Sequence, residues 1–169
     1  MKKLLLLAPV IAAILVVLAS CGPTSQQAVD YNDAIILKQI AIFDAINELD
    51  AAYENYVPEE MDAAMEEALL VTNDGIAFLD GLEPFDGSTE FKDHAMELFK
   101  VYKNVLENEF SRMIEIYKLP EDLYTQDEMD EWEELYDDAY DRMNKALQVF
   151  NLYQATFAEK YNFVIQASE

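Results

Sequence analysis

The chain is poor in the side chains that most often bind metals or act as nucleophiles. Its 169 residues include one cysteine, Cys21, and one histidine, His94. A single cysteine excludes an intrachain disulfide. A di-iron bundle needs a Glu-x-x-His motif on each of two helices, and the residue three positions before His94 is Phe91. We therefore expect no metal site, no cofactor and no cysteine nucleophile, and we interpret His94 as a residue at the boundary of the core.

Glycine and basic residues are also scarce. With four glycines, the chain contains no Gly-rich phosphate loop and no Gly-x-Ser-x-Gly elbow, and His-Glu-x-x-His is absent as well. Eleven basic residues stand against 34 acidic ones, which gives a formal net charge of −23. Such a surface repels nucleic acid and anionic lipid headgroups. These absences predict a protein that is not an enzyme and does not bind nucleic acid.

The N-terminus has the order of features found in an export signal. Lys2 and Lys3 precede an apolar run over 4–18, and Leu18-Ala19-Ser20 leads to Cys21. The run is short for a membrane span, which needs about 20 apolar residues, and it suits a cleaved signal peptide. The small residues before Cys21 resemble the lipobox of bacterial lipoproteins, which implies that Cys21 is acylated and anchors the chain. The alternative is an uncleaved N-terminal anchor with an incidental cysteine.

The N-terminal pattern predicts three regions. Residues 1–20 are a lipoprotein signal peptide, residues 21–27 a lipidated tether and residues 28–166 a four-helix bundle. Gly22 follows the cysteine, where an Asp would indicate inner-membrane retention. This favours the outer membrane or cell surface over the inner membrane, in a cell envelope with two membranes.

Apolar periodicity beyond the tether predicts helices and no strands. We expect helices over about 26–56, 58–82, 89–118 and 125–164. Pro58 suits a first helical turn, Ser88 or Thr89 can cap the third helix, and Thr125 with Glu128 forms a capping box. Helices of this length joined by short loops predict an all-α, antiparallel up-down-up-down four-helix bundle.

Two apolar stripes indicate how the first and fourth helices pack. In the first helix the stripe is Val29, Ile36, Ile40, Phe43, Ile46 and Tyr53, widened by Ile35, Ile42 and Leu49. The fourth helix keeps a heptad spacing that predicts left-handed supercoiled packing, through Met129, Trp132, Tyr136, Ala139, Met143, Ala146, Phe150, Tyr153 and Phe157.

Glycine and proline mark the irregular positions. Gly75 in the second helix permits either a close helix approach or a kink, and Asn73-Asp74-Gly75 is the expected local break. The segment 81–88 contains Gly, Pro and Asp and predicts a loop, from which we expect Phe85 to fold back onto the end of the core.

Acidic residues concentrate near the start of the fourth helix. Eleven acids and no base lie between Glu121 and Asp141. Because ligands on a straight helix splay rather than converge, we interpret the run as a solvated face and not as a cation site. If the third and fourth helices are antiparallel, Arg112 and Lys118 lie near this run and pair with it.

Several polar residues interrupt the apolar stripes: Glu109, Asn32, Gln39 and Asp50. Three interpretations follow, in order of preference. Helix drift carries the polar side chains to the surface, or they pair inside and set the helix register, or they line a small-molecule pocket. The third interpretation makes Glu109, Gln39 and Tyr102 the candidate ligand-binding residues.

The mature region resembles an uncharacterised family of small bacterial surface lipoproteins. The similar residues are Tyr31-Asn32-Asp33 with Ile36 and Gln39, Pro84-Phe85 with Gly87 and Phe91, and Phe150, Gln154, Phe157-Ala158 and Tyr161-Asn162-Phe163. The resemblance implies an exported lipoprotein with a helical-bundle domain and carries no catalytic residues.

The functional hypothesis is a lipid-anchored cell-envelope protein that acts through its surface as an interaction or structural module. It would attach to the membrane through acylated Cys21 and contact an envelope or extracellular protein. The alternative is a bundle that holds a small ligand or a cation between its helices.

Overall fold

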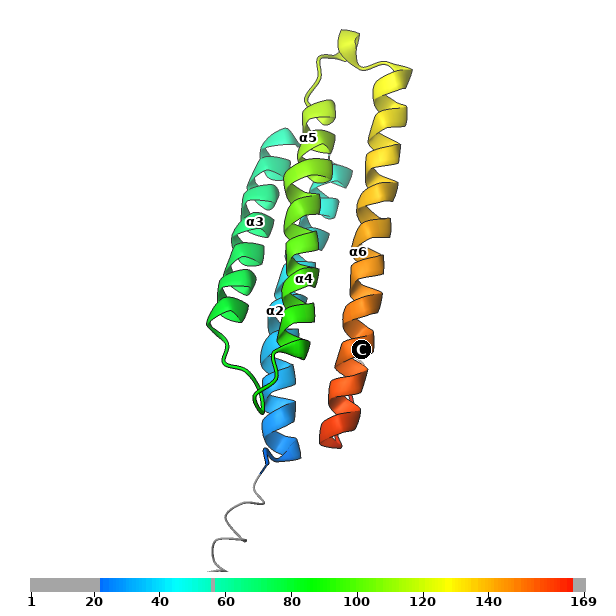
Figure 1. Ribbon diagram of the computed structural model, residues 1–169. Coiled ribbons are helices and arrows are strands. Elements are labelled where there is room, and N and C mark those ends of the chain that lie inside the picture. The colour runs from blue at the N-terminus through cyan, green and yellow to red at the C-terminus, as the bar shows by residue number, and fades with distance from the viewer. Residues whose placement is uncertain (1–21, 56, 166–169) are drawn as a thin grey trace, which may run out of the picture.

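The chain is all-helical in the computed structural model, which describes residues 22–55 and 57–165 (Figure 1). No strand occurs in these ranges, and four long helical segments lie side by side. The third segment combines two α-helices and a π-helical turn. The elements are α2 (Ser25–Asn55), α3 (Pro58–Gly81), α4 (Glu90–Val105), the π-helical turn η1 (Leu106–Phe110), α5 (Ser111–Tyr117), the 3-10 turn η2 (Glu121–Leu123) and α6 (Gln126–Tyr161).

The predicted signal peptide and Cys21 lie outside the described residues. Among the residues that are described, none of the helices is both long and apolar enough to span a bilayer.

The first helix begins earlier than the predicted tether allows. Thr24 and Gln27 cap the helix reciprocally, because each side chain accepts a hydrogen bond from the backbone N–H of the other. The Ser25 hydroxyl donates to the Tyr161 carbonyl at 2.6 Å. Residues 25–27, which we assigned to the tether, therefore belong to the helical domain.

Contacts between distant residues show which helix ends are neighbours. α2 packs mainly against α3, and α4 packs mainly against α6. Gln154 of α6 donates to Asn32 near the start of α2. Tyr140, one third of the way along α6, donates to Asp50 near the end of α2. The C-terminal end of α6 thus lies beside the N-terminal end of α2, at the lower end of the molecule in Figure 1.

The buried stripe of α2 differs in part from the predicted one, of which Ile46 and Tyr53 are buried as expected. Ile35, Ile42 and Leu49 are fully buried, whereas Ile40 is 41% exposed and Phe43 is 44% exposed. This helix carries apolar residues on more than one side, so periodicity alone does not predict which side is buried. Packing against α3 and α6 selects the stripe that includes Ile35.

The predicted heptad seam of α6 is confirmed at four positions from Ala139 onward. Ala139, Met143, Phe150 and Phe157 are buried, but Met129 is 48% exposed. In Figure 1, α6 begins slightly above the end of α5, and Met129 lies in this first turn of α6. At the other end the helix stops at Tyr161 rather than near Val164, because Asn162 adopts a left-handed conformation.

The local end signals agree with the structure at two positions. Pro58 opens α3 in its first turn. Thr125 and Glu128 form the expected capping box at the start of α6, and these hydrogen bonds lower the pKa of the Glu128 carboxyl. At the start of α4, Thr89 is the N-cap residue but its side chain does not cap a backbone N–H.

Gly75 lies at a close helix approach, and the break predicted there is wrong. α3 runs through the Asn73-Asp74-Gly75 segment without interruption. A Cβ at residue 75 would lie 3.0 Å from Ile42 of α2 and 3.2 Å from the Phe99 ring of α4. The missing side chain therefore lets α2, α3 and α4 pack closely together at this level.

We expect Gly75→Leu to lower the free energy of unfolding by about 1–3 kcal/mol, because the larger side chain overpacks the contact with Ile42 and Phe99. Gly81→Leu is the matched control, since a Cβ at residue 81 meets no atom within 4 Å, and it should change stability by less than about 0.5 kcal/mol. Urea denaturation of both variants checks this, and equal losses would contradict the close approach.

Candidate functional site

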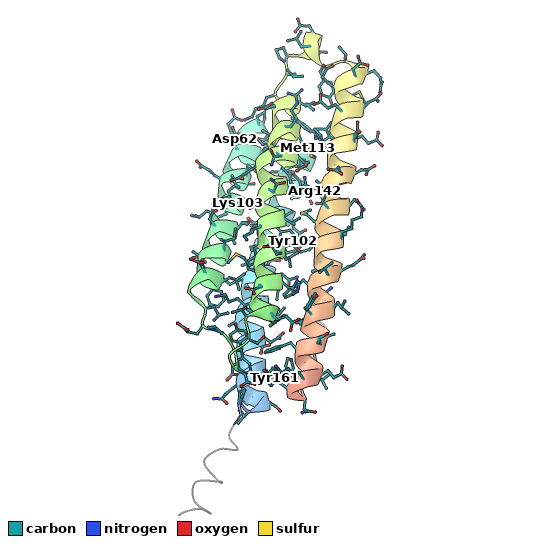
Figure 2. All side chains as sticks on the ribbon, viewed as in Figure 1. Asp62, Tyr102, Lys103, Met113, Arg142 and Tyr161 are labelled. Atoms are coloured by element: carbon teal, nitrogen blue, oxygen red, sulfur yellow. The ribbon has the colours of Figure 1, made fainter. Side chains whose placement is uncertain are left out.

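The three candidate ligand-binding residues do not meet at one point. Tyr102 is 1% exposed and forms a hydrogen bond with Gln39 of α2. Burial raises the pKa of Tyr102 to about 12. Glu109 lies about two turns further along the third segment and pairs with a different helix. Tyr102 lies at mid-height in the bundle (Figure 2).

Glu109 lies in the π-helical turn η1 and is 8% exposed. Arg142 of α6 donates to its Oε1 atom and also to the side chain of Asn104. This burial contradicts the preferred interpretation, in which drift carries Glu109 to the surface. A π-turn adds a residue to one turn, which changes the direction of the side chains that follow it.

Two buried atoms near this turn lack a hydrogen-bond partner within the described chain: Glu109 Oε2 and Trp132 Nε1. The backbone of the turn is better satisfied, because the Tyr53 hydroxyl donates to the Phe110 carbonyl at 3.2 Å. A π-turn leaves carbonyls outside the regular helical pattern, and a buried carbonyl needs a partner. Tyr53 supplies that partner, and burial beside Asp50 raises the pKa of its hydroxyl.

Asn32 and Gln154 act as the register interpretation predicts for polar core residues. Both side chains are buried, and Gln154 donates to Asn32 at 2.9 Å between α6 and α2. Any sliding of one helix against the other would leave both amides unpaired in an apolar interior, which costs about 1–3 kcal/mol. The pair therefore favours a single alignment of these two helices.

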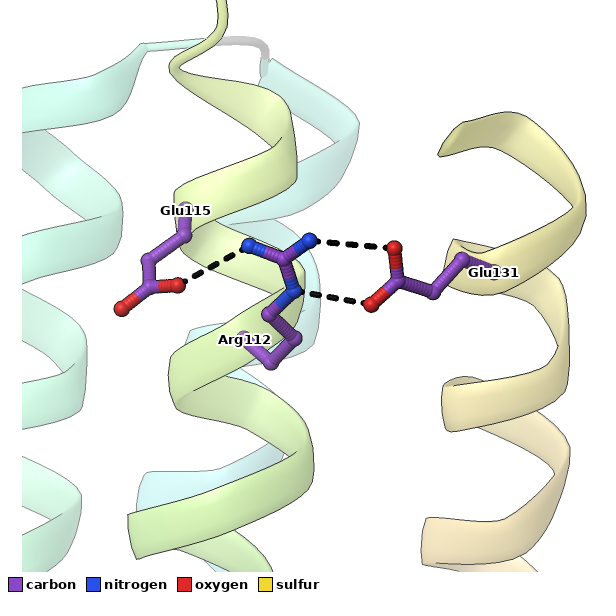
Figure 3. Close-up of polar contacts among 3 residues, drawn as sticks. All are labelled: Arg112, Glu115 and Glu131. Carbon is purple, nitrogen blue, oxygen red and sulfur yellow. Dashed lines mark hydrogen bonds and ion pairs between the residues drawn. The ribbon is translucent and has the colours of Figure 1, made fainter. Parts of the chain in front are cut away.

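The acidic run on α6 is a row of outward-facing side chains. Asp130, Glu133, Glu134, Asp137, Asp138 and Asp141 border an open surface hollow. Within the part of the chain that the structure describes, no three metal-ligating side chains converge. Glu131 is held from the neighbouring segment, because Arg112 donates two hydrogen bonds to Glu131, at 2.8 and 3.0 Å, and one to Glu115 (Figure 3).

Arg112 meets the acidic run as expected, but Lys118 does not. Lys118 pairs with Asp62 at the start of α3. The end of α5 lies close enough to α3 for this pair to form across the top of the bundle. The guanidinium of Arg112 lowers the pKa of the Glu131 carboxyl, and the pKa of Arg112 itself is raised.

The lower end of the bundle carries an aromatic cleft that our sequence analysis missed. Phe85 folds back from the 82–89 loop as predicted, and its ring lies 5.0 Å from the rings of Tyr31 and Tyr161. A two-residue turn at Asp86 and Gly87, both with positive φ, places the Phe85 ring there. The cleft encloses about 40 Å³ and is lined by Tyr31, Phe85, Ser88, Glu90, Phe91, Tyr153, Thr156, Phe157, Lys160 and Tyr161.

The cleft has apolar walls and a charged rim. Lys160 lies over the Tyr161 ring, 5.0 Å from its centroid, and the Tyr161 hydroxyl donates to Asp86 at 3.1 Å. A volume of about 40 Å³ holds only two or three waters, so a larger ligand would have to bind at the mouth. His94 stacks on Tyr153, with ring centroids 3.3 Å apart, which agrees with a boundary position.

Charge is distributed unevenly over the surface. No acidic residue occurs between Ala34 and Phe43 on α2, or between Arg142 and Ala158 on α6. The hydrogen bonds from Gln154 to Asn32 and from Tyr140 to Asp50 lie on either side of residues 34–43 of α2 and of residues 142–153 of α6, so these two stretches lie at the same height. We call six of their exposed side chains the acid-free face: Leu37, Ile40, Phe43, Gln148, Asn151 and Leu152.

Comparison of the whole chain with family models, with curated proteins and with solved structures finds no match.

We expect Arg142→Met to lower the free energy of unfolding by about 1–3 kcal/mol, because the variant leaves the buried Glu109 carboxylate without its cationic partner. Lys145→Met is the control on the same helix. Its side chain is 71% exposed and pairs with Asp141 one turn away, so the loss should stay below about 0.5 kcal/mol. Guanidinium denaturation measures the free energy of unfolding of both variants. An Arg142→Met variant with unchanged stability would contradict the pairing.

Stability should fall as the pH rises from about 10 to 12, in part because of Tyr102. Below pH 10 its hydroxyl is neutral in both states. Between the unfolded value of about 10 and the folded value of about 12, the unfolded chain loses this proton first, which favours unfolding by an amount on the order of 2 kcal/mol.

Tyr102→Phe should therefore flatten the decrease between pH 10 and 12, whatever its effect at neutral pH. Tyr124→Phe is the control, because Tyr124 is 40% exposed. Urea titrations at several pH values give the slope for each variant. Parallel slopes for Tyr102→Phe and the unsubstituted chain would show that Tyr102 is not shielded from water.

Proposed function

We propose that this chain is a lipid-anchored protein of the bacterial cell envelope that acts through its surface, as a non-enzymatic interaction or structural module. In this proposal residues 1–20 are cleaved as a signal peptide and Cys21 is acylated. The outer membrane or cell surface is favoured over the inner membrane. The mature chain would then belong with the small surface lipoproteins that it resembles.

The proposed architecture is an antiparallel up-down-up-down bundle standing on a short tether. Pairs between helix ends support it: Ser25 with Tyr161, Asn32 with Gln154, and Lys118 with Asp62. Ser25 is the first helical residue, four positions after Cys21. An anchored chain would therefore hold the lower end of the bundle close to the membrane and direct the acidic end of α6 away from it.

The acid-free face is the observation that carries the surface role. Leu37 is 67% exposed and Leu152 is 66% exposed, although exposing large apolar side chains to water is unfavourable. A contiguous exposed apolar patch on a soluble domain is typical of an interaction surface. In the interior, by contrast, the candidate residues Glu109, Gln39 and Tyr102 bond to other side chains of the same protein.

The aromatic cleft favours a second candidate function, which is binding of a small ligand at the lower end of the bundle. Its rim offers Glu90 and Lys160 for orientation, and its walls offer stacking surfaces. Native mass spectrometry of the protein purified from its own membrane in mild detergent distinguishes the two. Retained mass that is lost on denaturation favours the ligand-binding function, and a bare acylated chain favours the surface role.

We expect the full-length protein, expressed in bacteria, to incorporate labelled palmitate and to partition into the detergent phase. Cys21→Ser should abolish both properties, because the hydroxyl does not replace the thiol that carries the lipid. Gly22→Ala is the control and should retain them. Intact mass spectrometry gives the N-terminus, and an unacylated chain beginning at Met1 would refute the anchor.

A further inference from the structure

We infer that the acid-free face is a self-association surface, through which a second copy of this chain packs in a two-fold symmetric dimer. The inference rests on the proposed surface role and names the partner for it. The face consists of Leu37, Ile40 and Phe43 on α2 and Gln148, Asn151 and Leu152 on α6. Each of these six side chains is exposed.

The chemistry of the face matches a copy of itself. All three of its α2 side chains are apolar, and so is Leu152. Gln148 and Asn151 are amides, which both donate and accept hydrogen bonds. A two-fold interface places the same patch on both partners. The contact therefore buries apolar side chains and amides of both copies, and none of the six side chains of either face is charged.

Net charge restricts where two copies can approach each other. The chain carries a formal charge of −23, so most pairs of surfaces bring carboxylates together. A basic partner would instead be attracted to the acidic half of α6, where eleven acids lie between Glu121 and Asp141. The uncharged face is the place where another copy meets the least repulsion.

Screening lengths decide whether the nearby acids prevent this contact. Asp141 lies seven residues before Gln148, the nearest face residue on α6, which is about 10 Å along the helix. The Debye length is about 8 Å at physiological ionic strength and about 30 Å at 0.01 M. The acidic half of α6 is therefore screened from the face in the first condition and not in the second. On α2, Asp44 directly follows Phe43 and Asp33 lies one turn before Leu37, so these two exposed acids are the ones that salt must screen.

The dimer should consequently strengthen as salt is added. Association through opposite charges would weaken under the same change. The two-fold axis must also run along the bundle, because both copies would be anchored in one membrane. In that arrangement Gln148 and Asn151 of each copy lie next to α2 or α6 of the other copy.

The test introduces a new cysteine into the face, which is possible because Cys21 is the only cysteine in the sequence. Gln148→Cys and Asn151→Cys are introduced into the full-length protein, and isolated membranes are treated with an oxidant. We expect a disulfide-linked band of twice the chain mass for one or both variants, with a yield that rises between 10 mM and 0.5 M salt. Leu70→Cys is the control, because Leu70 is 64% exposed but lies on α3, away from the face.

Three further variants keep the test independent of any one cysteine position. Leu152→Asp should reduce the cross-linked fraction at least tenfold, whereas Leu70→Asp, at similar exposure, should not change it. Asp44→Asn should raise the cross-linked fraction at low salt. Circular dichroism of each variant shows whether the helices remain intact.

Two outcomes would overturn the inference. One is the absence of a dimer band at every salt concentration, and the other is equal cross-linking at residue 70. The intact mass of the chain in the same sample shows whether Cys21 is acylated, and this separates the two proposals. An unacylated chain that still forms the face-specific dimer refutes the anchor and keeps the dimer. An acylated chain that does not form it refutes the dimer and keeps the anchor.

Discussion

Repulsion among 34 acidic side chains is the constraint that the rest of this structure meets. A compact fold brings these charges together, and each unit of uncompensated charge opposes that compaction. The chain places its densest acidic run on the outer side of α6, where the side chains point into water. The start of that run also lies at the positive end of the helix dipole, which favours negative charge.

Three of the cations form ion pairs that connect the third segment and α2 to neighbouring helices. Arg112 joins the third segment to α6 through Glu131, Lys118 joins it to α3 through Asp62, and Lys38 joins α2 to α3 through Asp74. Exposed pairs of this kind contribute little stability individually. Their value lies in orientation, because each one opposes the separation of two acidic helices at a different height.

The π-helical turn connects the interior to this pattern of charge. Glu109 lies seven residues after Tyr102, so helical periodicity places both on the buried side of the third segment. In the π-turn Glu109 binds Arg142, which also binds Asn104. A buried ion pair is not by itself stabilising, because both ions lose their hydration. It does specify how α6 lies against the third segment, as Asn32 and Gln154 specify how α6 lies against α2.

Features that depend on neighbours within a few residues along the chain follow from the sequence. They are the helical class, the approximate helix bounds, Pro58, the Thr125 capping box and the turn that carries Phe85. Tertiary structure alone decided that Ile35 is buried while Ile40 is exposed, and that Glu109 is paired. It also decided that Lys118 contacts Asp62, and that Tyr31, Phe91 and Tyr161 line one cleft. Those outcomes depend on which residues of other helices lie opposite, and helical periodicity specifies a face of one helix without identifying what packs against it.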